Sequence, residues 1–274
     1  MTLEQPIGVF DSGVGGLSVL YELRRQMPNE NYLYIGDSGR NPYGPRSVAT
    51  VTQFTLEAAG FLQKAGAKAM VIACNTATVA ALDATIRAFP DMFVIGVVEA
   101  GCLAAIDVSS NGHIAVVASK GTIDSGGHAA KITELRPGTN VTGVPAPLFV
   151  ALAEEGWLEG AAPEAVAERY LGELFAESNK GRPDSLILGC THFPLLEKPI
   201  RKAVGDKIIL VDPAAITAQK TQAALAGRNQ LRKEATPGAI RFCVTADAER
   251  FARIGSLFLQ TPIAAEDVQV VSLA

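Results

Sequence analysis

Two of the four cysteines occupy matching positions along the chain. Cys74 follows the apolar run 69–73, and a Thr-bearing turn and a helical pattern come after it. Cys190 follows the apolar run 185–188 in the same way. In a parallel α/β sheet, ligands collect at the carboxyl ends of strands, where amides of the next helix point outward. A helix N-terminus stabilises thiolate over thiol, so the pattern predicts two cysteines able to act as general base or general acid.

A purely structural reading of the cysteines is the alternative, because cysteine is among the most commonly buried residues. Cys102 and Cys243 lie in apolar patterns without a strand-end turn, and we expect both in the core. No CxxC pair occurs in the sequence, and clustered ligands for zinc are missing. The sequence therefore predicts four reduced thiols and no metal site.

Further polar groups accompany both predicted strand ends. Asp11 and Ser12 close the apolar run 7–10, and His192 lies two residues after Cys190. Asp11 could orient Cys74 or bind an ammonium group, although an Asp or Ser at this place is also an ordinary helix cap. His192 could tune Cys190 or exchange protons with it, although an isolated histidine often serves only as a hydrogen-bonding group.

The residues that follow the thiols could bind a substrate carboxylate. Asn75, Thr76 and Thr191 offer an amide, hydroxyls and backbone donors at predicted helix starts. Ordinary capping would explain each of them equally well. Tyr43 and Gly44, in the segment RNPYGPRS, could close the pocket, although such a loop can also be a simple turn.

The glycine-rich segment after the first strand also invites a dinucleotide-binding interpretation. Gly13, Gly15 and Asp37 match part of that fingerprint, but Ser18 stands where its last glycine is needed. Asp11 would also place a negative charge beside the pyrophosphate. The sequence therefore favours chemistry without a nucleotide cofactor.

Short apolar runs alternate with helical patterns, which is typical of βα units around a largely parallel sheet. One such helical pattern begins at Leu17 and is stopped by Pro28. The sequence predicts strands over the following ranges: 7–10, 32–35, 69–73, 93–97, 113–117, 185–188, 207–211 and 241–244. The similarity of segments 69–82 and 185–198 indicates two related halves, with one thiol on each side of a cleft.

Composition limits the function further. The 274 residues are 48% hydrophobic and 19% charged, with a net charge of −4, so the chain is an ordered globule without the basic field that nucleic acid requires. No apolar run is long enough for a membrane span, and the N-terminus lacks a signal-peptide pattern. We expect a cytoplasmic enzyme acting on a small molecule, with neither nucleic acid nor membrane as a partner.

Five segments together resemble the cofactor-independent aspartate/glutamate racemase superfamily, and within it the glutamate-specific members. These segments are VFDSGVGGLSVL, YIGDSGRNPYGPRS, VIACNTATVAAL, VIGVVEAG and LILGCTHFPLL. CNTAT with CTH favours glutamate, since aspartate-selective relatives more often carry GGMGP, CNTAH and CTE. The segment around His128 departs from the family pattern, in which a tyrosine is common nearby.

The resemblance implies two pseudo-symmetric α/β domains with central, largely parallel sheets and the active site in the cleft between them. The first domain would comprise residues 1–97 plus 208–274, and the second residues 98–207. The resemblance also implies a homodimer without a cofactor. Cys74 and Cys190 would be the catalytic acid and base. Asp11 would assist Cys74, and His192 would assist Cys190; Glu154 would lie near the second thiol, with Glu155 leaving the register open. The implied substrate-binding residues are Asp11, Ser12, Tyr43, Gly44, Asn75, Thr76, Thr191 and His192.

The expected reaction is therefore the interconversion of L- and D-glutamate, which supplies D-glutamate for peptidoglycan. Two thiols can serve the two faces of an α-carbon, whereas a single base cannot face both sides without a large motion. An aspartate racemase with the same machinery is the nearest alternative. A hydrolase or decarboxylase that uses only Cys190 and His192, and a binding module without catalysis, are alternatives of other classes.

Overall fold

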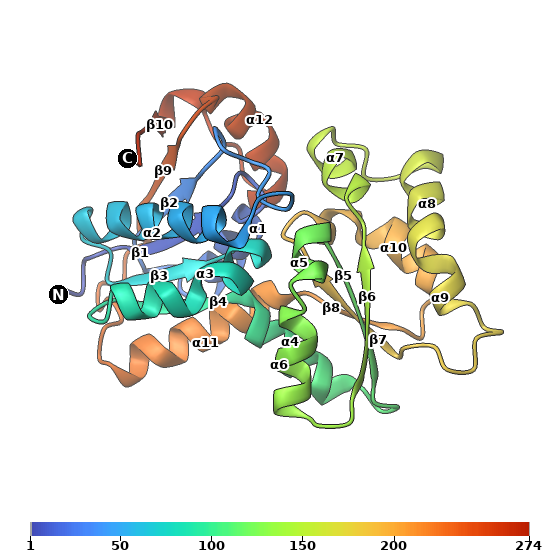
Figure 1. Ribbon diagram of the computed structural model, residues 1–274. Coiled ribbons are helices and arrows are strands. Elements are labelled where there is room, and N and C mark those ends of the chain that lie inside the picture. Colours follow the sequence, from blue (N-terminus) through green and yellow to red (C-terminus); the bar gives the residue numbers. More distant parts are fainter. Residues whose placement is uncertain (1, 274) are drawn as a thin grey trace. The chain divides into compact units, whose positions relative to one another are not determined.

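The computed structural model describes residues 2–273, and the chain divides into two compact units. One unit comprises the residues up to Val97 and those from Ala214 onward, and the other comprises Val98–Pro213 (Figure 1). The family resemblance implies that the chain returns to the first domain at residue 208. In the structure, β8 (Ile209–Val211) pairs with β7 (Ser185–Gly189) in the second unit, so the chain returns at Ala214.

The first unit is built on a six-stranded sheet in the order β10-β9-β2-β1-β3-β4, and every pairing in it is parallel. β9, from the last part of the chain, pairs with β2 from its first part, and β10 pairs with the outer side of β9 (Figure 1). The strands are β1 (Ile7–Asp11), β2 (Tyr32–Gly36), β3 (Ala69–Ile72), β4 (Phe93–Gly96), β9 (Ile240–Val244) and β10 (Val268–Val270). The helices are α1 (Leu17–Gln26), α2 (Val48–Lys64), α3 (Asn75–Ala88), α11 (Pro213–Gly227) and α12 (Ala248–Leu259), with a 3₁₀ turn at Ala265–Asp267.

The second unit is built on a four-stranded parallel sheet in the order β6-β5-β7-β8. Its remaining strands are β5 (His113–Ala118) and β6 (Asn140–Pro145). Its helices are α4 (Val97–Val108), α5 (Lys120–Asp124), α6 (Gly127–Leu135), α7 (Leu148–Glu154), α8 (Ala161–Ala167), α9 (Glu173–Phe175) and α10 (Glu197–Val204), with a π-helical turn at Glu168–Gly172 and a 3₁₀ turn at Phe193–Leu196. The predicted α/β class with two parallel sheets is confirmed.

All eight strands predicted from apolar runs are present, and two strands were not predicted. β1 and β2 are buried at every position, as expected for strands covered on both faces. β6 is an edge strand whose residues are exposed or half-buried, and it contains Gly143 and Pro145. β10 is also an edge strand and is only three residues long. β6 and β10 both lack the continuous apolar run that identifies a buried strand. No helix of the described residues is long and apolar enough to cross a membrane.

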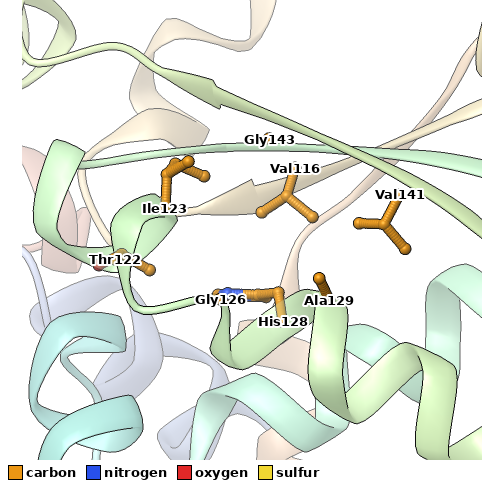
Figure 2. A pocket seen from close by; sticks show the side chains of 8 residues that line it. All are labelled: Val116, Thr122, Ile123, Gly126, His128, Ala129, Val141 and Gly143. Carbon is orange, nitrogen blue, oxygen red and sulfur yellow. The ribbon is translucent and has the colours of Figure 1, made fainter.

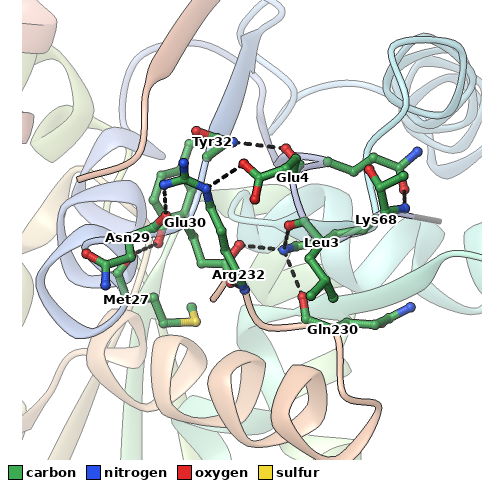
Figure 3. Close-up of polar contacts among 12 residues, drawn as sticks. Leu3, Glu4, Met27, Asn29, Glu30, Tyr32, Lys68, Gln230 and Arg232 are labelled. Carbon is green, nitrogen blue, oxygen red and sulfur yellow. Dashed lines mark hydrogen bonds and ion pairs between the residues drawn. The ribbon is translucent and has the colours of Figure 1, made fainter. Parts of the chain in front are cut away.

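A buried ion pair joins the connection after α11 to the first sheet (Figure 3). The Lys68 side chain is fully buried, and its Nζ lies 2.5 Å from Glu30 Oε2. The same ammonium donates hydrogen bonds to the backbone oxygens of Leu3 at 2.9 Å and Gln230 at 2.8 Å. Glu30 Oε1 accepts from the backbone N–H of Arg232 at 2.7 Å. These bonds hold residues 230–232 against the amino ends of β2 and β3.

We predict that Lys68→Met destabilises the first unit by about 3–5 kcal/mol, because it leaves the Glu30 carboxylate buried without its cation. The double variant Lys68→Met/Glu30→Leu should recover a large part of that loss, since it removes both charges. Urea unfolding followed by circular dichroism measures the effect. As a control, Lys198→Met breaks an exposed pair with Glu159 and should leave the unfolding midpoint unchanged. A Lys68→Met midpoint equal to that of the control would contradict the assignment.

Candidate active site

In the first unit, the polar residues predicted from the sequence lie at the carboxyl ends of neighbouring strands. β1 ends at Asp11, and it pairs with β3, which Cys74 follows after one residue. Asp11 is buried, and its Oδ2 accepts a hydrogen bond from the backbone N–H of Gly13 at 2.9 Å. Ser12 is half-buried, and its Oγ lies 3.6 Å from the thiol of Cys74. Asp11, Ser12 and Cys74 therefore share one edge of the sheet.

Cys74 is the N-terminal cap of α3. Its backbone is extended, and its Sγ accepts from the N–H of Ala77 at 3.5 Å. The first-turn amides and the dipole of α3 therefore point at the sulfur, which stabilises a negative charge on it. The thiol is 6% exposed, so it is shielded from bulk solvent. This environment suits a thiol that gives up and regains a proton.

Asn75 and Thr76 follow at the start of α3. Asn75 is buried, and its Oδ1 has no hydrogen-bond partner among residues 2–273. A buried amide oxygen without a donor is costly. Thr76 is half-buried in the same turn.

Tyr43 and Gly44 belong to the loop that follows β2, the other neighbour of β1. The Tyr43 ring is buried, and its hydroxyl donates to Asp37 Oδ2 at 2.5 Å. Burial is the main cause and the nearby Asp37 carboxylate the second cause of a pKa of Tyr43 far above its ordinary value. The phenol therefore keeps its proton. Gly44 is half-buried beside it.

Asp37 is a positioning residue that the sequence analysis did not assign to the site. It is fully buried and accepts from Tyr43, from Arg40 Nε at 2.7 Å and from the hydroxyl of Thr245 at 2.8 Å. Arg40 also pairs with Glu57 on α2. Asp37 therefore fixes the Tyr43 loop to β9 and α2. The signal in the sequence is an acidic residue directly after a strand, which also matches part of a nucleotide-binding fingerprint.

In the second unit, Cys190, His192 and Glu154 form a chain of polar contacts. The Cys190 sulfur lies 3.8 Å from His192 Nδ1, and His192 Nε2 lies 3.1 Å from Glu154 Oε1. His192 is buried, whereas Cys190 and Glu154 are half-buried. Thr191, which separates Cys190 and His192 in the sequence, is also buried. The structure therefore brings together the thiol, the imidazole and one carboxylate at the end of β7.

Aromatic packing sets the position of Glu154. Phe149 of α7 contacts Phe193 edge to face, with ring centroids 5.2 Å apart. Because Phe193 directly follows His192, this contact packs α7 against the segment that carries the imidazole. Glu154 is the last residue of α7 and reaches His192, whereas Glu155 is exposed. The contact identifies Glu154 as the partner of the imidazole.

His192 carries a positive charge at neutral pH. Burial by itself would lower its pKa, but the hydrogen bonds and charges of Cys190 and Glu154 outweigh burial and raise the pKa of His192 to about 10. Because the folded-state pKa lies above the ordinary value, these contacts stabilise the fold fully below pH about 6.5. That contribution is lost as the pH rises through about 10. The imidazolium presents a positive charge to the Cys190 sulfur.

The two thiols differ in what stabilises their charge. Cys74 caps an α-helix, but a 3₁₀ turn follows Cys190, and α10 begins only at Glu197. The prediction of a helix N-terminus at both thiols is therefore wrong for Cys190. The His192 cation, held by Glu154, supplies the positive charge at that thiol instead.

The other cysteines lie in the core. Cys102 is fully buried, its Sγ donates to the carbonyl of His128 at 3.8 Å, and burial raises its pKa to about 12. Cys243 is buried at the end of β9, and burial raises its pKa as well. Both therefore stay protonated at neutral pH. No group of three metal-ligating side chains occurs within residues 2–273.

The chain is similar to known proteins over most of its length. The family model described as Asp/Glu/Hydantoin racemase matches residues 9–221. A glutamate racemase of Levilactobacillus brevis is 42% identical over 270 residues, covering 98% of this chain and 96% of that protein.

Two solved structures are similar over nearly the whole chain. One is the glutamate racemase isoform RacE1 of Bacillus anthracis, with a TM-score of 0.91, 37% identity and 98% of both chains covered. The other is the glutamate racemase of Francisella tularensis in complex with D-glutamate, with a TM-score of 0.90 and 36% identity. It covers 99% of this chain and 98% of its own.

We predict that Glu154→Gln lowers the pKa of His192 from about 10, because the variant removes a carboxylate that stabilises the imidazolium. A pH titration of the ¹⁵N-labelled imidazole signals measures the change, which should exceed one unit. Glu155→Gln is the matched control and should leave the titration of His192 as it is in the wild type. An equal shift in the two variants would show that Glu154 is not the partner.

Proposed function

The chain belongs to the Asp/Glu/hydantoin racemase family, and from that premise we propose that Cys74 and Cys190 interconvert L- and D-glutamate by a two-base mechanism. One thiol removes the α-proton, and the other delivers a proton to the opposite face. The observation that supports the proposal most is that each thiol has its own, different source of positive potential. The reaction needs no cofactor in this proposal.

The Cys74 half of the mechanism relies on the edge of the first sheet. The α3 amides stabilise Cys74 as a thiolate, and Ser12 lies within reach of its sulfur. Asp11 lies at the same edge, where its carboxylate can bind the substrate ammonium or orient the thiol. We propose that Cys74 serves as base for one enantiomer and as acid for the other.

The Cys190 half relies on an imidazolium. His192 is a cation at neutral pH and lies against the Cys190 sulfur, while Glu154 fixes the imidazole ring. When Cys190 takes the α-proton it becomes neutral, and the Glu154 carboxylate remains as the partner of the His192 cation. His192 and Glu154 therefore act as positioning groups for the second thiol.

Inversion passes through a carbanion, which needs donors at the α-carboxylate and exclusion of water. Thr76 and Thr191 offer hydroxyls beside the two thiols, and Asn75 offers a buried Oδ1 that can accept from the substrate ammonium. Tyr43 and Gly44 cover the first strand end from the loop that Asp37 fixes. We propose these residues, together with Asp11, Ser12 and His192, as the substrate-binding set.

We also propose a biological role for the reaction. The product D-glutamate would enter peptidoglycan synthesis, and the protein would act in the cytoplasm as a homodimer. The full-length similarity to proteins named glutamate racemase supports the glutamate specificity. Polarimetry of the purified protein with glutamate and aspartate tests this specificity, and an absorption spectrum tests for bound pyridoxal phosphate. Faster turnover of aspartate would contradict it.

We predict that Cys74→Ser and Cys190→Ser each lower kcat for racemisation by at least about 100-fold, because each removes the acid or base for one face. The change in the circular dichroism signal of glutamate measures the rate, starting from the L-enantiomer and, separately, from the D-enantiomer. Cys102→Ser and Cys243→Ser are the controls, since these buried thiols are outside the proposed catalytic and substrate-binding set. Near-normal turnover in either of the first two variants would eliminate the two-thiol mechanism.

We predict that in deuterated water the first D-glutamate formed from L-glutamate carries deuterium at the α-carbon, while unreacted L-glutamate stays largely protiated. The delivering thiol has exchanged with solvent before the substrate binds, and the other thiol holds the original proton. Mass spectrometry of the separated enantiomers at a few percent conversion measures the label. Mostly protiated D-glutamate would indicate a single shuttling base.

A further inference from the structure

Some buried titratable side chains have no part in the proposed mechanism, and His128 is one of them. It lines a pocket of the second unit that opens to solvent between the sheet and the helices α5 and α6 (Figure 2). Both ring nitrogens of His128 are inaccessible to solvent, so they do not face the pocket. None of the residues that line the pocket belongs to the proposed catalytic or substrate-binding set.

Tyr34 of β2, in contrast, is a buried group beside the proposed site. Its side chain is fully buried, and its ring packs against Phe251 of α12, with ring centroids 5.6 Å apart. Its hydroxyl donates a hydrogen bond to the backbone oxygen of Gly13 at 2.9 Å. Gly13 follows Asp11 and Ser12 in the segment between β1 and α1. The phenol therefore contacts the loop that carries both of these site residues.

Gly13 links the phenol to the Asp11 carboxylate. The Gly13 carbonyl accepts from Tyr34, and the Gly13 N–H donates to Asp11 Oδ2 at 2.9 Å. The same carbonyl lies so close to Gly36 that a Cβ at that position would overlap its oxygen. It is therefore confined between the phenol and the backbone of β2. Any shift of the Gly13 peptide would also move the N–H that holds the carboxylate.

The Tyr34 hydroxyl keeps its proton at neutral pH. Burial is the largest cause of a pKa of Tyr34 well above its ordinary value, and the charges of Asp11 and Cys74 are the next causes. The hydroxyl therefore lies within electrostatic reach of both site residues. Because the phenol stays neutral, it remains a donor to the Gly13 carbonyl.

We propose that Tyr34 is a positioning residue for racemisation, whose hydroxyl fixes the Gly13 peptide and through it the Asp11 carboxylate at the edge of the sheet. The inference rests on the proposed role of Asp11 beside Cys74. Tyr34 is fully buried and its hydroxyl bonds to the protein backbone, so it acts through Asp11 and not on the substrate.

Tyr32 provides a matched control on the same strand and the same face of the sheet. It is 1% exposed, and its hydroxyl lies 2.9 Å from the backbone oxygens of Leu23 and Met27, at the other end of α1. Tyr32→Phe and Tyr34→Phe therefore each remove one buried hydroxyl that bonds to the backbone. Only Tyr34→Phe removes a hydroxyl that bonds to the Asp11 loop.

Hydrogen exchange of the Gly13 amide, followed by NMR without substrate, tests the positioning by itself. In Tyr34→Phe this amide should exchange about tenfold faster than in the wild type, the effect of one lost buried hydrogen bond. In Tyr32→Phe its exchange should match the wild type. Equal exchange of the Gly13 amide in the two variants would overturn the proposal, whatever reaction the protein catalyses.

A double-mutant cycle with Asp11→Asn tests the link to the reaction. Tyr34→Phe should lower kcat/KM for glutamate about tenfold, whereas Tyr32→Phe should change it by less than about twofold. In the Asp11→Asn background, Tyr34→Phe should cost less than about twofold, because the carboxylate that it positions is gone.

The cycle also separates the two ways in which the inference could fail. An equal cost of Tyr34→Phe in both backgrounds, or a cost in the wild type no larger than that of Tyr32→Phe, would overturn the role of Tyr34. Wild-type turnover by Asp11→Asn alone would instead contradict the proposed function of Asp11, on which the inference rests.

Discussion

The parallel hydrogen bonding of β1 with β2 and β3 is the constraint on which the rest of the first unit depends. The register places Asp11 opposite Gly36 and Phe10 opposite Ile72, so the three strands end at one edge. The segment that leads into α1 must approach that edge closely. A Cβ at Gly16 would lie 2.5 Å from the Asp11 Cβ, so only glycine fits there. This close packing shields Asp11 and Cys74 from water, which strengthens the electrostatic effect of α3 on the thiol.

The second sheet repeats the strand end but not its electrostatics. A helix dipole acts on Cys74 within one turn and depends only on backbone amides, so it does not titrate. The charge beside Cys190 belongs to His192, and it depends on Glu154 and on the thiolate itself. The two halves therefore place the same chemical group in one fixed and one titratable environment. In the proposed reaction the two thiols exchange the roles of acid and base, so each environment serves both roles in turn.

The buried polar groups differ in whether the protein itself supplies their hydrogen-bonding partners. Lys68 and Asp37 are fully buried, and each is surrounded by ion pairs and hydrogen bonds that offset its desolvation. Such groups tie distant segments together and fix the site loop. Asn75 Oδ1 is buried without a partner among the described residues, at the edge where we propose that the substrate binds.

The sequence by itself determined the α/β class, the buried strands and the position of the two thiols directly after strands, because these features appear in short patterns. Apolar runs identify buried strands, and a cysteine after such a run lies at a strand end. Tertiary structure decided the edge strands β6 and β10, the choice of Glu154 over Glu155, and the role of Asp37. Glu154 meets His192 across 38 residues, and Thr245 meets Asp37 across 208. Contacts of that separation arise from packing of whole elements, such as Phe149 against Phe193, and leave no local pattern in the sequence.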